Sequence, residues 1–250
     1  MSVQSEAELI QEIERLRAEL SQREREAAAK ERQLERYAAD LRETFKRERA
    51  RAQELRQSYT ETVRALSNAV EARDAYTGKH AERVAAYGLE IARTLGLRPS
   101  DRPELEFGFL LHDIGKVAIP DAILYKPSAL TDEERALMER HPVIGAQIVR
   151  GIAFLDEAVE VVRSHHERWD GHGYPDALTG EEIPLPARVF AVADVLDALT
   201  TDRPYRPASP LAVAREMIAA ESGTHFDPDV IEAFNSIEDA TLTSIATQIG

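Results

Sequence analysis

The sequence contains no cysteine among its 250 residues. This absence excludes disulfide bonds, a cysteine nucleophile and metal sites built on thiolates, so any bound metal must be held by His, Asp or Glu. No apolar run approaches the ~20 residues that a transmembrane helix needs, and the first residues do not have the pattern of a signal peptide. We therefore expect a cytoplasmic protein without a membrane span.

Basic residues are scarce relative to acidic ones. The chain holds 31 Lys and Arg against 45 Asp and Glu, which gives a net charge of −14. The first 60 residues carry 13 of each sign, so the remainder carries the whole excess. A protein that coats a nucleic-acid duplex normally presents a basic face. The charge therefore argues against DNA binding, and a small anionic ligand would require a local cluster of cations.

Residues 1–73 contain neither glycine nor proline and are rich in helix-forming residues. Apolar or small residues recur there at steps of three and four, as in a coiled coil. This apolar seam comprises Leu9, Ile13, Leu16, Leu20, Ala27, Leu34, Tyr37, Leu41, Phe45, Ala52, Leu55, Tyr59 and Leu66. Two consecutive steps of four, from Tyr37 to Phe45, interrupt the heptad phase. We predict a parallel coiled coil that forms a homodimer; a solvated single helix is the alternative, because Arg23 and Lys30 weaken the seam.

Glycine, proline and all seven histidines appear from about residue 74 onward. The pattern predicts an amphipathic helix at 80–95 that Gly96 ends. A capping box formed by Thr131 and Glu134 predicts a second helix start, and residues 185–200 predict a strongly apolar helix. No convincing alternating strand pattern occurs, so the predicted class is all-α.

The predicted organisation has three parts. A coiled-coil helix occupies residues 1–73, a helical-bundle domain occupies 74–238, and a C-terminal tail occupies 239–250. No other part of the chain resembles a repeat or a low-complexity segment.

Imidazoles and carboxylates occur side by side in the second part, as His112-Asp113 and as His165-His166-Glu167. Neighbouring residues of a helix point about 100° apart, which suits two adjacent metal ions better than one. Asp113 could bridge both ions through its two oxygens. A His and Asp set without Cys is typical of Fe, Mn or Zn in a hydrolytic site.

Two further carboxylates lie in the apolar helix predicted at 185–200. An unpaired Asp194 would be costly there, and a metal ion would satisfy it; an ion pair with Arg188 is the alternative. Asp197 lies three residues later and therefore on the same face.

Cations follow the candidate ligands at short range. Lys116 comes three residues after Asp113, and Arg203 and Arg206 come after Asp197. Beside a metal pair such side chains can hold phosphate oxygens, which arginine does in a bidentate way. Solvated surface cations are the alternative, because spacing alone is weak evidence.

Several motifs together resemble one known family. They are HDIGK at 112–116, HP at 141–142, HHERWDGHGYP at 165–175 and ADVLDALTTDRPYR at 193–206, with YTGKHAERV at 76–84 and HFDP at 225–228 as outer motifs. In this order they are similar to the HD-GYP domain, a branch of the HD phosphohydrolases, over about residues 70–235. The resemblance implies an α-helical bundle with a metal centre.

The resemblance also implies metal-dependent hydrolysis of cyclic di-GMP to linear pGpG, with GMP as a further product, by a hydroxide that two metal ions activate. It implies that one metal is held by His80, His112, Asp113 and Asp194, and the other by Asp113, His141, His165 and His166. It assigns the scissile phosphate to Lys116, Arg203 and Arg206, the pocket wall to Tyr174, and catalytic roles to Asp113, Lys116 and, from a supporting position, Asp197.

The number of metals follows from one position. Family members that bind three metals carry a Glu four residues before the first His, and this chain has Tyr76 there. A phenol is a poor ligand for a third ion in this setting. We therefore predict two divalent ions, with iron or manganese as the expected metal.

Two other functions stay open. The domain could hydrolyse another cyclic dinucleotide or nucleotide, because the motifs specify the metals better than the base. It could instead be a non-catalytic module that responds to cyclic di-GMP and meets a signalling partner, although the intact ligand set argues against pure binding. The coil is expected to carry a signal to the catalytic helices; a passive tether is the alternative.

Overall fold

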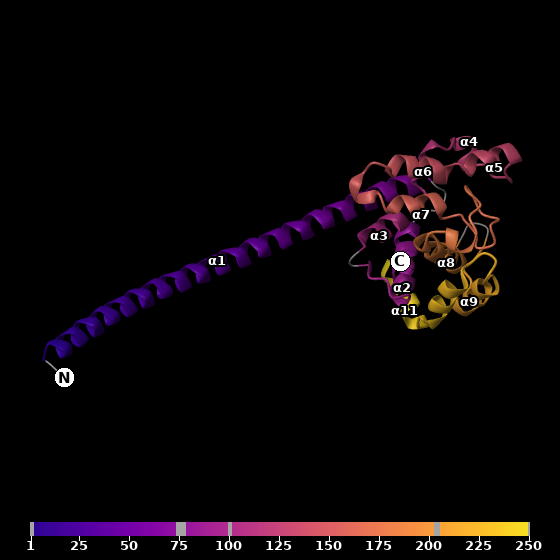
Figure 1. Cartoon of the computed structure of the whole chain (residues 1–250). Helices are drawn as coiled ribbons and strands as arrows, with labels where there is room; N and C mark the ends of the chain where they lie inside the picture. Colours follow the sequence, from indigo (N-terminus) through magenta and orange to yellow (C-terminus); the bar gives the residue numbers. More distant parts are fainter. Residues whose placement is uncertain (1–2, 74–78, 100–101, 203–205, 250) are drawn as a thin grey trace. The chain divides into compact units, whose positions relative to one another are not determined.

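The computed structural model describes residues 3–73, 79–99, 102–202 and 206–249. These residues form helices and two isolated β-bridges but no strand, so the predicted all-α class is confirmed (Figure 1). In the same ranges, no helix combines the length and the apolarity needed to cross a membrane. Contacts within the chain divide it into two compact units, Met1–Ser58 and Tyr59–Gly250.

The first unit is the greater part of one long helix, α1 (Val3–Glu71). Side chains of the apolar seam are exposed along it: Leu34, Leu41 and Phe45 are 67%, 70% and 71% exposed. Ion pairs one turn apart, such as Glu43 with Arg47, accompany the seam and support an isolated helix only weakly. Most helical stability in proteins comes from packing of an apolar face, and the seam is the face available for it.

The last turns of α1 belong to the second unit. The ring of Tyr59 stacks on that of Phe154 with centroids 4.2 Å apart, and Val63, Ser67 and Val70 are buried. Tyr59 therefore packs in the second unit, whereas the sequence pattern placed it in the coiled-coil seam. We predict a boundary between the two functional parts at residue 73, and it stays a prediction. The compact units defined by contacts within the chain meet at residue 58 instead.

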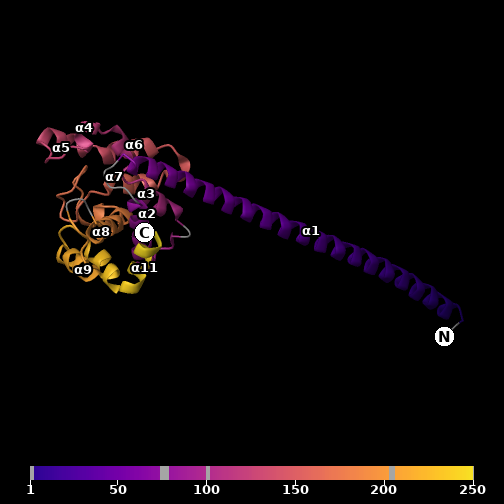
Figure 2. The ribbon, with the colours of Figure 1, turned by 180° about the vertical axis from the view of Figure 1, so that it is seen from behind.

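Helix α8 (Leu185–Thr200) is the central element of the second unit. It lies between α7 (Ala158–Ser164) and α9 (Leu211–Ala220), as both views show (Figures 1 and 2). Its apolar residues surround the helix, which is the pattern of a buried helix; Val189, Phe190, Val192 and Leu196 are 0% exposed. Helices α2 (His80–Thr94) and α10 (Pro228–Ser236) also pack on α8.

The remaining described elements complete the second unit. They are α3 (Pro103–Leu110), η2 (Ile114–Ala118), α4 (Asp121–Leu124), α5 (Asp132–Met138), α6 (His141–Val149), η3 (Ala153–Leu155), η4 (Gly180–Glu182) and α11 (Asp239–Ile249). Two of them, η2 and α6, contain candidate site residues. The predicted capping box starts α5, because Thr131 accepts from the Glu134 amide and the Glu134 side chain accepts from the Thr131 amide. The sequence predicts a C-terminal tail from residue 239. In the structure residues 239–249 form α11, which packs on α2 with Leu242 buried.

Candidate metal centre

Three histidines lie at the ends of helices and are oriented by the main chain. The Nδ1 atom of each lies within hydrogen-bond distance of the carbonyl oxygen three residues earlier: His112 with Phe109 at 2.9 Å, His141 with Met138 at 2.8 Å, and His165 with Val162 at 2.9 Å. A carbonyl oxygen can only accept, so each Nδ1 must carry the proton. In its neutral form, each ring therefore presents an unprotonated Nε2.

These Nε2 atoms converge on Asp113. The Nε2 atoms of His141 and His165 lie 3.1 Å apart, and Asp113 Oδ1 lies 3.2 Å from His141 Nε2. One ligand atom each from Asp113, His141, His165 and His166 lies within 4.8 Å of all the others. Lone pairs that face one another at these distances lack a hydrogen between them. A divalent cation would satisfy all four, so the donor set fits a metal ion.

Burial keeps two of these imidazoles neutral. Desolvation, followed by the neighbouring imidazoles, holds the pKa of His165 well below its ordinary value. Burial and His141 lower the pKa of His166 to about 3. Because a metal binds the neutral ring, both histidines are ready as ligands at neutral pH.

Asp113 faces both halves of the cluster. Its Oδ1 points to His141, and its Oδ2 lies 3.1 Å from His112 Nε2 and 2.8 Å from Lys116 Nζ. Burial alone would raise the pKa of Asp113, but the charge of Lys116 and the contacts of His112 outweigh it and hold the pKa well below its usual range. The carboxylate is therefore ionised, with one oxygen on each side.

His80 and Asp194 lie next to this group. The ring of His80 lies 5.6 Å from that of His112, and its Nε2 lies 3.4 Å from Asp194 Oδ1. Arg188 pairs instead with Asp227 at 2.6 Å, so the alternative partner for Asp194 is engaged elsewhere. The structure thus gathers Asp113, His141, His165 and His166 into one group and places the other three expected ligands, His80, His112 and Asp194, beside it. Their binding of metal stays a prediction.

Asp197 orients His80 and is itself held by Arg83, a residue that the sequence analysis missed. His80 Nδ1 lies 2.8 Å from Asp197 Oδ2, and Arg83 donates from Nε to Asp197 Oδ1 at 2.6 Å. Burial alone lowers the pKa of His80, but the Asp197 hydrogen bond and the charge of Asp194 raise it overall. Arg83 follows His80 by three residues and so shares its helix face. This spacing is the sequence feature that could have identified Arg83.

We expect Arg83→Ala to weaken both folding and metal binding. Asp197 is 3% exposed, and a buried charge that loses its partner costs about 3–5 kcal/mol. A misoriented His80 should lower metal affinity by about 10–100-fold, the usual effect of losing such a supporting contact. Thermal unfolding and metal titration measure the two effects.

Arg93→Ala is the matched control, because Arg93 lies on the same helix and pairs with Glu90 at the surface, where such pairs contribute little. Equal effects of the two substitutions on metal affinity would contradict the role that we give to Arg83.

The loop that contains the GYP sequence borders the cluster. The ring of Tyr174 stacks on that of His166 with centroids 4.7 Å apart and 28° between the planes. Arg206 donates to the carbonyl of Ala198 near the end of α8, and its Nε is buried without a hydrogen-bond partner among the described residues. Arg203 and Tyr76, for which we state expectations above, lie outside the described residues.

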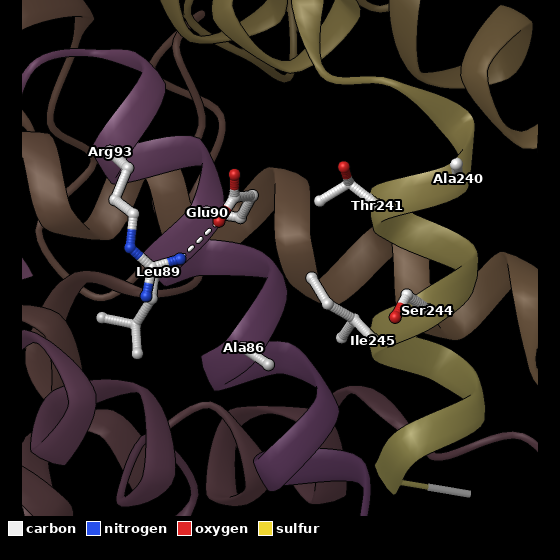
Figure 3. Close-up of a pocket in the computed structure, with 8 residues that line it drawn as sticks. All are labelled: Ala86, Leu89, Glu90, Arg93, Ala240, Thr241, Ser244 and Ile245. Carbon is white, nitrogen blue, oxygen red and sulfur yellow. Dashed lines mark hydrogen bonds and ion pairs between the residues drawn. The ribbon is translucent and has the colours of Figure 1, made fainter.

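The other two histidines do not join the ligand cluster. The side chain of His172 is 83% exposed and lies beside Asp170, and the ring of His225 stacks on Phe226. A surface pocket between α2 and α11 is also separate (Figure 3). It is lined by residues such as Leu89, Glu90 and Ile245 and contains no predicted site residue. The convergent histidines therefore remain the candidate site.

The sequence matches known proteins over the region that carries this geometry. A family model described as HD domain matches residues 64–230. The chain belongs to the HD domain family. Its likeness to solved structures agrees in fold: a crystal structure of a cyclic GMP-AMP specific phosphodiesterase of Vibrio cholerae has a TM-score of 0.59 at 23% identity, covering 76% of this chain and 52% of that one.

Curated relatives extend the comparison beyond the HD domain itself. The chain is 39% identical over 219 residues to the cyclic di-GMP phosphodiesterase response regulator RpfG of Xanthomonas campestris pv. campestris, covering 86% of this chain and 55% of that protein. It is 42% identical over 181 residues to the 3′3′-cGAMP-specific phosphodiesterase 2 of Vibrio cholerae, covering 72% and 35%. The resemblance to HD-GYP phosphodiesterases is thus confirmed, while this chain spans about a third to a half of the length of these relatives.

Proposed function

We propose that this HD domain hydrolyses a phosphodiester bond of cyclic di-GMP and releases linear pGpG, with GMP as a further product. The observation that carries the proposal is the convergence of unprotonated imidazole nitrogens on the ionised Asp113, with Lys116 2.8 Å from its other oxygen. Bound there, two divalent ions would supply an activated water for attack on phosphorus. Iron or manganese is the metal that we propose.

The chain's own residues supply orientation and charge. Main-chain bonds fix the tautomers of His112, His141 and His165, so these ligands need little reorganisation. We propose that Lys116 and Arg206, with Arg203, receive the phosphate oxygens, because the chain is acidic elsewhere and needs local cations for an anionic substrate. Tyr174 covers one side of the cluster through its stacking on His166 and forms the pocket wall.

A second substrate has a specific observation in its favour. One relative at 42% identity is named a 3′3′-cGAMP-specific phosphodiesterase, so cyclic GMP-AMP is the alternative. Incubation of metal-loaded protein with each dinucleotide, followed by chromatography, separates the cases. We expect pGpG from cyclic di-GMP at the higher kcat/KM. Preferential cleavage of cyclic GMP-AMP would establish the alternative, and binding without cleavage of either would reject the enzyme in favour of a ligand-responsive module.

We further propose that α1 pairs with α1 of a second copy as a parallel coiled coil and carries a signal to the HD domain, where a signalling protein is a candidate source. The exposed apolar seam supports pairing. The transmission route is supported by two contacts around the metal-binding turn: Ser67 donates to the Leu110 carbonyl at 2.7 Å, and Arg73 donates to the Val117 carbonyl at 2.9 Å. His112, Asp113 and Lys116 lie between these two points. The cytoplasmic location stays a prediction.

Two truncations test the roles of α1. A chain that begins at residue 59 keeps the buried Val63 and Val70, so we expect it to fold as a monomer. A chain that begins at residue 74 loses both, and burial of such side chains stabilises a fold by about 1.5–3 kcal/mol each. Sedimentation and thermal unfolding measure these outcomes. A dimeric 59–250 chain would contradict the coiled-coil dimer, and equal stability of the two truncations would contradict the packing role of the last turns.

A further inference from the structure

Glu167 is a buried carboxylate to which the proposed mechanism assigns no role. It follows the ligands His165 and His166 directly and is 3% exposed. Its two oxygens accept one main-chain bond each: Oε1 from the Asp176 amide at 2.7 Å and Oε2 from the Leu178 amide at 3.0 Å. Both acceptor atoms of this side chain are therefore committed to the loop that follows Tyr174.

The loop adopts a conformation that suits this carboxylate. Ala177, between the two donors, has a φ of 52°, a backbone angle that residues other than glycine rarely adopt. Successive residues of opposite hand turn their amide groups toward a common point and form an anion-binding concavity. The amides of Asp176 and Leu178, on either side of Ala177, both donate to the Glu167 carboxylate, so the buried acid stabilises the turn that contains this unusual φ.

The start of the loop is attached to the same short segment. A Cβ on Gly173 would lie 2.4 Å from the Arg168 amide nitrogen and 2.6 Å from the His166 carbonyl oxygen, so only glycine fits there. The Tyr174 amide donates to the His166 carbonyl at 3.2 Å. The loop is thus fastened to residues 166–168 at its beginning through Gly173 and Tyr174, and at its end through Glu167.

We propose that Glu167 is a positioning residue that fastens the 173–178 loop and thereby keeps the ring of Tyr174 stacked on His166. It acts through Tyr174 and holds the pocket wall in place for the substrate; it does not bind the metal. The inference deepens the proposed function and rests on it, because Tyr174 is useful only if a substrate enters this site.

Glu167→Gln tests the inference. The glutamine has the same shape, but its amide nitrogen is a donor, so one of the two loop amides must lose its acceptor. We expect the KM for cyclic di-GMP to rise about tenfold, the factor that one lost hydrogen bond supplies, while kcat and the metal content change little. Glu181→Gln is the matched control, since it removes an equal charge from an exposed position nearby and should leave KM unchanged.

Two further measurements separate positioning from a general loss of structure. If Glu167 acts through Tyr174, then Glu167→Gln should add little to the KM of Tyr174→Ala, because the effects of substituting residues that are linked by contacts do not add. Hydrogen exchange at the Asp176 and Leu178 amides should quicken in Glu167→Gln and not in Glu181→Gln. Additive effects on KM, or unchanged exchange at both amides, would overturn the inference.

The exchange measurement does not depend on catalysis. If the wild-type protein cleaves no cyclic dinucleotide, the proposed function fails, and the role of Glu167 in the loop is still decided by exchange. If cleavage is observed and Glu167→Gln has the wild-type KM, the inference fails and the proposed function stands.

Discussion

Asp113→Ala is expected to remove bound metal and phosphodiester hydrolysis together. The Asp113 carboxylate has one oxygen 3.2 Å from His141 Nε2 and the other 3.1 Å from His112 Nε2. It therefore lies at short range from His112 of one expected metal site and from His141 of the other. Without it, Lys116 loses the carboxylate at 2.8 Å, and a cation remains beside the histidines where metal should bind.

The expected size of this effect is large. A metal pair supplies several kcal/mol of transition-state stabilisation, and each 1.36 kcal/mol is tenfold in rate, so turnover should fall by about a thousandfold or more. Elemental analysis of the purified protein and chromatography of the product measure the two losses. Metal content and turnover near the wild-type values would refute the site.

Asp113→Asn controls for folding, because the amide keeps the shape of the side chain. We expect it to retain helical circular dichroism and still to lose metal, since it supplies no anionic oxygen. A variant that binds metal normally but turns over slowly would instead assign Asp113 to the chemistry alone.

Gly115→Ala, which adds one methyl group, should destabilise the fold more than any other added methyl group in this site. A Cβ at Gly115 would lie 1.9 Å from the His141 carbonyl oxygen and 2.6 Å from the Gly145 amide nitrogen. Both are main-chain atoms, which cannot rotate away, so η2 and α6 must separate. Overpacking typically costs 1–3 kcal/mol and sometimes more; because backbone meets backbone here, we expect about 3 kcal/mol or more.

Separation of η2 from α6 also moves Asp113 away from His141, so metal affinity should fall with stability. Thermal unfolding with and without metal checks this, with a loss of about 10 °C expected for a domain of this size. Gly96→Ala is the control: a Cβ there meets nothing within 4 Å, and only the φ of 81° opposes it, at about 1 kcal/mol. If the two substitutions shift the midpoint equally, the close approach of η2 to α6 does not constrain this fold.

The residues that converge in the candidate metal centre could be picked out from sequence because their motifs are local. Adjacent His and Asp residues have few structural uses, and the motifs fix His112, Asp113, His165 and His166 in one order along the chain. The capping box at Thr131 was predictable for the same reason, since both of its bonds form within four residues.

Contacts between distant segments could not be predicted in this way. Arg83 meets Asp197 114 positions away, and apart from sharing a helix face with His80, Arg83 looks in sequence like a solvated arginine. The last turns of α1 show the same limit. Leu66 is 46% exposed, as a coiled-coil position should be, whereas Val63, one turn earlier, is fully buried. A helix that serves two partners carries two overlapping patterns, and we recognised only the heptad.

The hydrogen bonds that orient His112, His141 and His165 all end on carbonyl oxygens three residues earlier. Every amino acid has that oxygen, so the identity of the residues at 109, 138 and 162 is irrelevant to ring orientation. The backbone conformation thus determines that Nδ1, and not Nε2, carries the proton of each imidazole. Evolution or a protein engineer can exchange Met138, for instance, to reshape the surroundings without disturbing the Nε2 atoms that face Asp113.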